Sequence, residues 1–298
     1  MPNLAISVTD LSKKYGKALA VSHTNFQVPL GTICGFVGPN GAGKTTTIRM
    51  LLGLITPTGG TAEVLGESIT HPEKYLSRVG AMIEGPAFYP ALSGEENLKV
   101  LATLGGYPIE RVGELIKTVG LEGRGNSKYK TYSLGMKQRL GIAAALLPNP
   151  QLLILDEPFS GFDPINANML KDEIFGLKER GTSILLSTHR MESVEELCDS
   201  IALINQSKVV LTGEKEEVRS RFKKDEYAVK FSGELTNSSA FEVVSVDAEQ
   251  HSAVIKLAKS DGTNQAISAL IKQVDLFEFK EVIPSFNDIF IQVVEETK

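Results

Sequence analysis

Long apolar runs, basic stripes and cysteines are all scarce in this chain of 298 residues. No apolar run approaches the roughly 18 residues that a membrane-spanning helix needs. The N-terminus lacks a basic stretch followed by an apolar block, so we expect no secretory signal. The net charge is −5 and no basic stripe is visible, which argues against a nucleic-acid groove. The two cysteines, Cys34 and Cys198, lie in apolar segments, which favours a reducing compartment over a disulfide framework.

The order of apolar segments in the first part of the chain predicts a mostly parallel sheet. Hydrophobic residues make up 42% of the sequence, enough for a sizeable core, and the length allows two domains. Short apolar runs alternate with helical stretches, as in sheets that are covered by helices on both faces. Residues 13–17 and 59–61 resemble turns. The predicted strands are 4–9, 24–29, 33–37, 62–66, 152–155, 183–186 and 201–204, and the predicted helices are 46–54, 95–103, 109–119, 134–146, 166–180 and 191–197.

After residue 214 the pattern changes to that of a small α+β domain. The residues 215–225 are either a linker or a helix. The sequence therefore predicts a first domain over 1–214, with helices dominating about 92–147, and an accessory domain over 215–298. The predicted strands of the second domain are 226–231, 241–246, 253–257 and 277–282, and its predicted helices are 266–274 and 285–294.

The most specific motif is GPNGAGKTT at residues 38–46, which fits the phosphate-loop pattern G-x-x-x-x-G-K-[ST]. A strand of the buried type leads into it and an apolar helix leads out, which is the context that the motif requires. Successive backbone N–H groups of such a loop surround nucleotide phosphates at the positive end of a helix. The predicted nucleotide-binding residues of this loop are Gly38, Pro39, Asn40, Gly41, Ala42, Gly43, Lys44, Thr45 and Thr46.

Three residue types in this loop have separate predicted tasks. Gly38, Gly41 and Gly43 allow a close approach of the backbone and positive φ angles. Lys44 is placed to reach the β- and γ-phosphates, and the hydroxyl of Thr45 to bind Mg²⁺. The alternative is a glycine-rich turn without a ligand, which would bind no nucleotide in calorimetry.

The apolar strand predicted at 152–155 ends in two carboxylates, Asp156 and Glu157. In a parallel sheet the carboxyl ends of the strands face the ligand. We therefore expect Asp156 to hold Mg²⁺ through a water molecule and Glu157 to act as the general base for the attacking water. A positioned base contributes about 10²–10⁴-fold in rate. The alternative is a strand that simply ends in a solvated acidic turn.

With these motifs, the chain resembles the ATP-binding subunit of an ABC transporter over residues 4–213. Tyr15, in SKKYG, matches the aromatic residue that stacks on adenine in that family. Ser133 and Gly135, in SLGMKQ, match the signature segment that binds the γ-phosphate held by the opposite subunit. A half-buried hairpin tyrosine is the alternative for Tyr15.

Two more segments carry the same resemblance. The sequence SGFD at 160–163 matches the loop that links the two nucleotide sites across the family's dimer. His189 follows a predicted strand and matches the histidine that senses γ-phosphate. A lone histidine at such a place is more often structural, so that reading stays open as the alternative.

The chain departs from the family pattern at three positions. Leu134 replaces the usual first glycine of the signature and Met136 replaces the usual glutamine, while Ser133 and Gly135 carry most of the phosphate contact. Glu84 stands where most members have a glutamine that joins Mg²⁺ and the water beside the transmembrane partner. The resemblance implies that Glu84 still binds Mg²⁺ or orients the water, with an altered dependence on pH and metal. The alternative is a solvated loop glutamate.

Three segments resemble a narrower group within the family, which exports bacitracin-like or lantibiotic peptides or confers immunity to them. They are Glu84 with PAFYP at 86–90, SLGMKQRLGIAAA at 133–145 and PSFNDIF at 284–290. The last segment also resembles the C-terminal end of drug-export and sodium-export ATPases.

The resemblance implies an α/β fold, the P-loop nucleotide hydrolase fold. It has a RecA-like parallel sheet core, a β-subdomain, an inserted helical subdomain over about 92–147 and a small C-terminal α+β domain. It implies ATP and Mg²⁺ as cofactors, a transmembrane permease and a second ATP-binding subunit, either a copy of this chain or a relative. Peripheral membrane association at the cytoplasmic face follows from the permease. Phe88, Tyr89 and the helix after Ser93 are the candidates for docking it, unless the aromatics only anchor their loop.

Several other functions remain as alternatives. An importer ATPase has the same motifs but often a different C-terminal extension. Non-transport members act on ribosomes, usually with two tandem ATP modules, or in DNA repair, with a long coiled coil, and this chain shows neither. A GTP switch would need an N-K-x-D motif, which is absent from the sequence. A sensor that moves no cargo has no distinguishing sequence feature.

Overall fold

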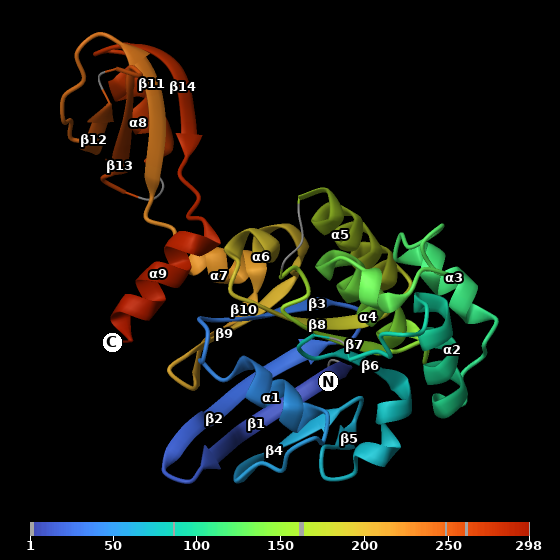
Figure 1. The fold of residues 1–298 in the computed structure, drawn as a ribbon. Helices are drawn as coiled ribbons and strands as arrows, with labels where there is room; N and C mark the ends of the chain where they lie inside the picture. The colour runs from blue at the N-terminus through green and yellow to red at the C-terminus, as the bar shows by residue number, and fades with distance from the viewer. Residues whose placement is uncertain (1–2, 86, 161–163, 248, 260–261, 298) are drawn as a thin grey trace. The chain divides into compact units, whose positions relative to one another are not determined.

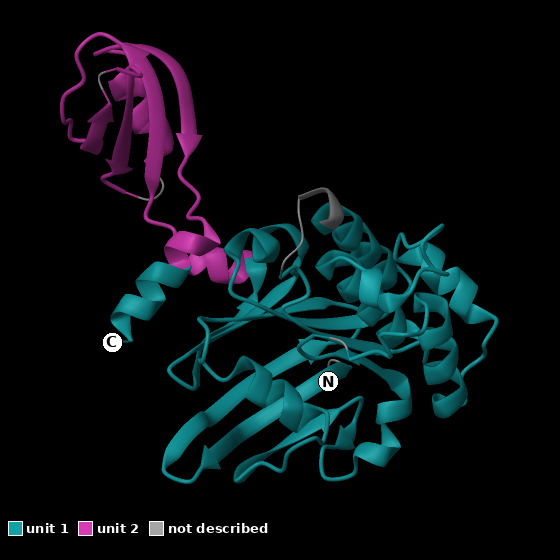
Figure 2. Cartoon of the chain, in the orientation of Figure 1, with its two compact units in different colours: residues 1–215, 290–298 teal, residues 216–289 magenta. Residues whose placement is uncertain are grey.

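The computed structural model describes residues 3–85, 87–160, 164–247, 249–259 and 262–297, with the backbone alone for 164–166. Contacts within the chain divide it into two compact units, residues 1–215 with 290–298 and residues 216–289 (Figure 2). Separate clusters of buried apolar side chains lie in the two units.

The centre of the first unit is a six-stranded sheet in the order β10-β9-β3-β8-β7-β6 (Figure 1). Its strands are parallel except for β10, which pairs antiparallel with β9. Every residue of β3, β7, β8 and β9 is buried, which is why the central residues of these strands are apolar. The strands are β3 (Ile33–Val37), β6 (Val79–Met82), β7 (Leu152–Asp156), β8 (Ser183–Thr188), β9 (Ser200–Asn205) and β10 (Lys208–Glu214).

A smaller antiparallel sheet, in the order β2-β1-β4-β5, and helix α1 (Lys44–Leu51) share a core with the large sheet. Phe26 of β2 stacks on Phe36 of β3 with ring centroids 5.1 Å apart. Ile48 of α1 is fully buried in the same cluster. The helix that follows the phosphate loop is therefore fixed by apolar packing. The smaller sheet comprises β1 (Leu4–Tyr15), β2 (Ala18–Pro29), β4 (Gly59–Val64) and β5 (Glu67–Ser68).

The helices of the first unit include a group of three between β6 and β7 in the sequence (Figure 1). The first of them begins with a capping box, in which Ser93 and Glu96 each bond the other's backbone N–H. The hydrogen bond from the Ser93 backbone holds the pKa of the Glu96 carboxyl below its usual value. The helices are α2 (Gly94–Gly105), α3 (Arg111–Thr118), α4 (Leu134–Leu146), α5 (Pro164–Glu179) and α6 (Met191–Leu197), with 3₁₀ turns at Pro72–Lys74, Leu76–Arg78 and Tyr129–Thr131.

The second unit contains an antiparallel sheet in the order β12-β13-β11-β14, packed against helix α8. Its core contains Val229, Phe241 and Ile255 from the sheet and Leu270 from α8. The last residues of the chain are grouped with the first unit, where Asn205 Nδ2 donates to Thr297 Oγ1 at 2.9 Å. The remaining elements are α7 (Lys215–Arg221), β11 (Glu226–Ser232), β12 (Phe241–Asp247), β13 (Ser252–Leu257), α8 (Thr263–Leu270), β14 (Asp275–Glu281) and α9 (Phe286–Glu296).

The predicted fold class is confirmed by this arrangement of a parallel core, a small antiparallel sheet, a group of helices and a separate α+β unit. The predicted strand 33–37 and the predicted helices 134–146 and 191–197 have the observed bounds. The ambiguous stretch after residue 214 begins with helix α7.

One predicted turn was too long and another was wrong. Residues 16 and 17 form the turn between β1 and β2, but β1 continues to Tyr15. β4 begins at Gly59, so residues 59–61 belong to a strand. Gly60 is required by a close approach and not by a turn between elements. Its φ is 75°, and a Cβ there would lie 2.1 Å from the carbonyl oxygen of Asp10.

Two strands of the large sheet, β6 and β10, were not predicted. β6 has only four residues, one of them Gly80, which weakens the apolar pattern. β10 is an edge strand with no fully buried residue, so polar side chains interrupt it. β6 is too short, and β10 too exposed at its edge of the sheet, to show the apolar run that identified the other strands.

The cysteines of the chain are both free and buried. Burial raises the pKa of the Cys34 thiol to about 12, and burial also raises the pKa of Cys198. Both thiols are therefore protonated in the folded protein at neutral pH, which makes them poor nucleophiles.

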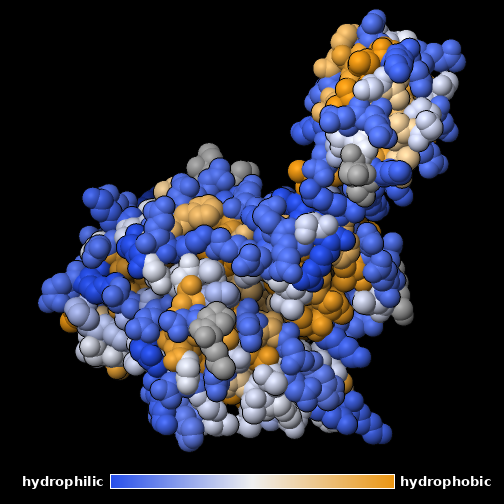
Figure 3. All heavy atoms as spheres, turned by 180° about the vertical axis from the view of Figure 1, so that it is seen from behind, coloured by the Kyte–Doolittle hydropathy of each residue, from blue (hydrophilic) through white to orange (hydrophobic). Residues whose placement is uncertain are grey.

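The described helices contain none that is long and apolar enough to cross a membrane. Seen from behind, the surface of the first unit is mostly hydrophilic, and its apolar residues lie in separate groups (Figure 3).

Gly80 lies where β6 contacts helix α4, since a Cβ there would be 2.0 Å from the carbonyl oxygen of Ala145. We expect Gly80→Ala to lower the free energy of unfolding by about 1–3 kcal/mol through overpacking, measured by urea denaturation. Gly113→Ala is the control, because a Cβ there meets no atom within 4 Å. It should stabilise α3 by up to about 1 kcal/mol. Equal midpoints for the two variants would contradict this packing argument.

Candidate nucleotide site

The phosphate loop, Glu157 and His189 follow the ends of three parallel strands. β3, β7 and β8 run in one direction, with Val37 paired to Thr188 and Asp156 paired to Ser187. The segments that follow these strands therefore leave the sheet at the same edge. The phosphate loop follows β3, Glu157 follows β7 and His189 follows β8.

Each glycine of the phosphate loop meets a different constraint. Gly41 has φ 79° and open space around a possible Cβ. Gly38 needs space alone, because a Cβ there would lie 2.2 Å from the carbonyl oxygen of Ile204. Gly43 needs both, with φ 111° and a Cβ position 2.5 Å from the carbonyl oxygen of Ala20.

The loop presents positive charge and backbone donors. Helix α1 begins at Lys44 with no acidic residue in its first turn and no side-chain cap from Gly43, so its first N–H groups can bind an anion. The ammonium of Lys44, 6% exposed, donates to the carbonyl oxygens of Gly38 at 2.7 Å and Pro39 at 3.2 Å. The Ala42 N–H donates to Pro39. Asn40 lies exposed at the tip of the loop and Thr46 lies in the first turn of α1.

Asp156 is a buried carboxylate at the end of β7. It accepts a hydrogen bond from Thr45 Oγ1 at 2.7 Å and another from Ser187 Oγ. Carboxylate and hydroxyl oxygens are the hard ligands that Mg²⁺ prefers, so this donor set fits that ion. Ser187 was not predicted as a site residue. The observation that identifies Ser187 is the register of β7 with β8, which pairs it with Asp156.

Glu157 joins the loop to the histidine. Its carboxylate lies 3.4 Å from Lys44 Nζ and 2.9 Å from His189 Nδ1. Its backbone is in the left-handed region, with φ 49°, and its N–H donates to the carbonyl and hydroxyl of Ser187. The turn after β7 thus places this carboxylate, 27% exposed, at the open side of the loop.

Glu84 also lies at this edge, two residues beyond β6, but its carboxylate contacts an arginine. Arg49 Nη2 donates to Glu84 Oε1 at 2.6 Å, and the backbone of Glu84 has φ 59°. Arg49 was not predicted as a site residue. Its position in α1, five residues after Lys44, was the available signal.

Tyr15 ends β1 with 49% of its surface exposed. The ammonium of Lys13 lies 5.1 Å from the centre of its ring and donates to the carbonyl oxygen of Thr56 at 2.6 Å. The tyrosine is therefore supported by a cation that is itself fixed, and its ring is open to solvent.

The signature residues lie at the start of α4. Ser133 is its N-cap and accepts from the Met136 N–H, Gly135 lies in its first turn, and Leu134 is 60% exposed. Among the described residues, no hydrogen bond or ion pair links Ser133 or Gly135 to the phosphate loop of the same chain. Ser160 donates its N–H to the Glu157 carbonyl, while 161–163 of the predicted linking loop lie outside the described residues.

The segment between Glu84 and α2 is held by a buried amide. Asn97 Oδ1 accepts from the Tyr89 N–H at 2.8 Å and its Nδ2 donates to the Tyr89 carbonyl at 3.1 Å. Phe88 packs edge-on against Tyr129 at 5.2 Å, and Tyr89 is 59% exposed. Pro86 lies outside the described residues.

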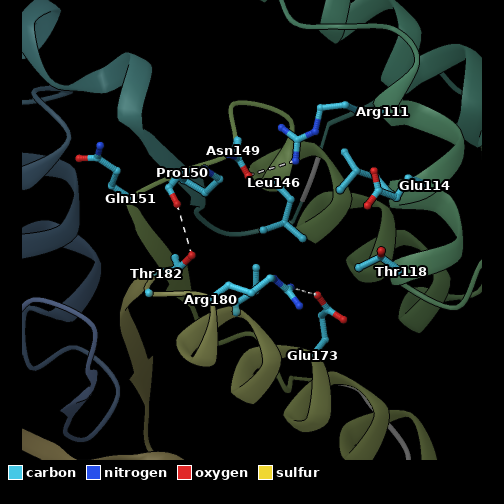
Figure 4. A pocket seen from close by; sticks show the side chains of 13 residues that line it. Arg111, Glu114, Thr118, Leu146, Asn149, Pro150, Gln151, Glu173, Arg180 and Thr182 are labelled. Carbon is cyan, nitrogen blue, oxygen red and sulfur yellow. Dashed lines mark hydrogen bonds and ion pairs between the residues drawn. The ribbon is translucent and has the colours of Figure 1, made fainter.

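A polar pocket of about 520 Å³ lies near the opposite ends of the strands (Figure 4). Arg111 reaches over it from α3 and bonds the Leu147 carbonyl, while Arg180 pairs with Glu173 of α5. Burial raises the pKa of Glu173. Gln151 and Thr182, the residues just before β7 and β8, line its wall, so this pocket is separate from the phosphate loop.

The parallel sheet, the glycine-rich loop and the carboxylates at the strand ends define a P-loop nucleotide hydrolase. Residues 21–160 match the family described as ABC transporter, and residues 213–294 match the family described as ATP-binding protein DrrA1-3-like, C-terminal domain. The solved structure of an ATP-binding subunit of an ABC transporter is similar, with a TM-score of 0.67 and 34% identity. The matched region covers 73% of this chain and 93% of the chain in that structure.

Two curated relatives narrow the class. Bacitracin transport ATP-binding protein BcrA of Bacillus licheniformis is 46% identical over 208 residues, 69% of this chain and 68% of that protein. Lantibiotic transport ATP-binding protein SrtF of Streptococcus pyogenes is 39% identical over 209 residues, 70% of this chain and 90% of that protein. The chain belongs to the ATP-binding subunits of ABC transporters, which bind and hydrolyse ATP and work with transmembrane partners. The predicted resemblance to the bacitracin and lantibiotic group is confirmed.

Two glycine substitutions test the loop geometry. Gly43→Ala should weaken ATP binding at least tenfold, because its Cβ would collide with the Ala20 carbonyl and force the loop to move. Gly41→Ala meets no atom, so only its left-handed conformation opposes the change, at about 1–2 kcal/mol. Titration with a fluorescent ATP analogue measures both. A loss at Gly41 equal to or larger than that at Gly43 would contradict the assignment.

Proposed function

We propose that this ATPase drives the export of bacitracin-like or lantibiotic peptides, or immunity to them, through a separate permease at the cytoplasmic face of the membrane. The similarity to a bacitracin and a lantibiotic transport protein supports the cargo class. The observation that carries the hydrolytic role is the carboxylate of Glu157, which is held between Lys44 and His189.

The residues that would hold the nucleotide follow from the geometry. The N–H groups at the start of α1 and the ammonium of Lys44 bind the phosphates. Thr45 and Asp156, already in contact through their oxygens, would hold Mg²⁺. The ring of Tyr15 would stack on adenine. Bound Mg²⁺ and ATP supply a polarised γ-phosphoryl group.

Glu157 has the position for a general base. It accepts a proton from the attacking water as the new oxygen–phosphorus bond forms and the bond to ADP breaks. His189 holds the same carboxylate at 2.9 Å and thereby sets its direction. Lys44, at 3.4 Å, offsets the charge that develops on the phosphoryl oxygens. Glu84 would bind Mg²⁺ or orient the water once its carboxylate leaves Arg49.

A second subunit completes the site. Ser133 caps α4, and its helix start is not joined to the phosphate loop of its own chain by any contact among the described residues. A second copy that faces the loop with Ser133 and Gly135 would supply further donors to the γ-phosphate. A second copy of this chain would form a homodimer closed by ATP, and a related ATP-binding subunit with the same signature is the alternative. The exposed Tyr89 loop, which is fixed by Asn97, contacts the permease.

The substitution Glu157→Gln tests the base. It removes a proton acceptor but keeps the size of the side chain, so we expect ATP binding to persist and hydrolysis to fall at least 100-fold. The variant should also accumulate as a dimer with ATP, measured by light scattering. Lys44→Ala is the comparison and should lose binding. Turnover of Glu157→Gln at the wild-type rate would exclude the base assignment.

Affinity purification tests the transport role. Tagged Glu157→Gln chain recovered from solubilised membranes with ATP should bring down a multi-span membrane protein at comparable abundance, identified by mass spectrometry. The same pull-down with Lys44→Ala controls for nucleotide dependence. Recovery with ribosomes or nucleic acid, and no membrane protein, would refute the permease.

A further inference from the structure

Arg49 and Glu84 form a charged pair beside the nucleotide site. Arg49 lies in α1, the helix that starts at Lys44, and its Nη2 is 2.6 Å from Glu84 Oε1. In the paired strands β6 and β7, Met82 is in register with Leu155. Glu84 and Glu157 each follow these residues by two positions, so both leave the sheet at the same edge.

This edge therefore carries three carboxylates, and each has its own partner. Asp156 accepts from Thr45 and Ser187, and Glu157 contacts Lys44 and His189. The cation paired with Glu84 is Arg49. Carboxylates that lie close together repel one another, so the arginine offsets the third negative charge and also decides which way its carboxylate points.

The ion pair between Arg49 and Glu84 can separate at little cost. Arg49 is 39% exposed and Glu84 63% exposed, and exposed ion pairs contribute little to stability. Glu84 is in the left-handed region, and next to it Gly85 has no atom within 4 Å of a Cβ position. Gly85 is conformationally permissive and has this space, so a change of its backbone can carry the carboxylate of Glu84 to another position.

We propose that Arg49 is a positioning residue that competes with the bound divalent cation for the carboxylate of Glu84. With the pair closed, Asp156 and Glu157 are the carboxylates that face the cation. With the pair open, Glu84 adds a third negative charge and an oxygen ligand. This inference rests on the proposed Mg²⁺ site and adds to it a switch between two positions of one side chain.

The test is a double-mutant cycle read by metal binding. Mn²⁺ is titrated into the full chain saturated with ADP, and free Mn²⁺ is followed by electron paramagnetic resonance. Arg49→Met keeps the apolar stem and removes the charge, so it should tighten Mn²⁺ binding about three- to fivefold, the scale of an exposed ion pair. In the Glu84→Gln background the same substitution should change the affinity by less than about 1.5-fold, because no carboxylate is released.

Two controls separate this effect from general loss of charge. Arg180→Met breaks the Arg180–Glu173 pair, 2.9 Å long, at the other pocket, and should leave Mn²⁺ affinity unchanged. ADP affinity without metal should be equal in the wild type and Arg49→Met. An equal effect of Arg49→Met with Glu84 and with Gln at that position, or no effect in either, would overturn the proposal.

The outcome also distinguishes this inference from the proposed function. If the wild-type chain with ADP binds no Mn²⁺ above the level of free ADP, the metal site itself is wrong. If wild-type binding is intact and the cycle shows no coupling between Arg49 and Glu84, only the competition is refuted.

Discussion

The hydrogen bonds of one buried carboxylate fix the rest of the site. Asp156 is 6% exposed, and a buried carboxylate needs partners because its desolvation is costly. Its partners are Thr45 at the start of α1 and Ser187 of β8. This connection sets the spacing of the phosphate loop, the end of β7 and the end of β8. Glu157 follows directly, and its backbone is held at the same strand end because its N–H donates to Ser187.

Packing holds this spacing in place. Helix α1 shares one apolar cluster with both sheets of the first unit, and the loop before it passes close to the carbonyls of Ile204 and Ala20. The backbone of the loop at Gly38 and Gly43 is therefore held close to its neighbours. Tyr15 and Glu84 differ, because both are exposed at the ends of strands. These two candidate site residues lie outside the apolar cluster that holds α1.

Much of the fold could be predicted because its central strands are buried on both faces and have apolar sequences. The failures have a common physical cause. β6 and β10 are short or lie at an edge, and Gly60 resembled a turn residue although it is required by the neighbouring Asp10 backbone. A pattern of neighbouring residues in the sequence cannot reveal a contact with a residue fifty positions away. Register and edge position are properties of the assembled sheet.

The sequence by itself determined the phosphate loop, the acidic pair after β7 and the class of protein, because these depend on residue types at fixed short spacings. The tertiary structure alone decided the partners of those groups. It joined Ser187 to Asp156, His189 to Glu157 and Arg49 to Glu84. These pairs are separated by 31 to 35 positions. Only the pairing of parallel strands and the packing of α1 bring their side chains to one edge of the sheet.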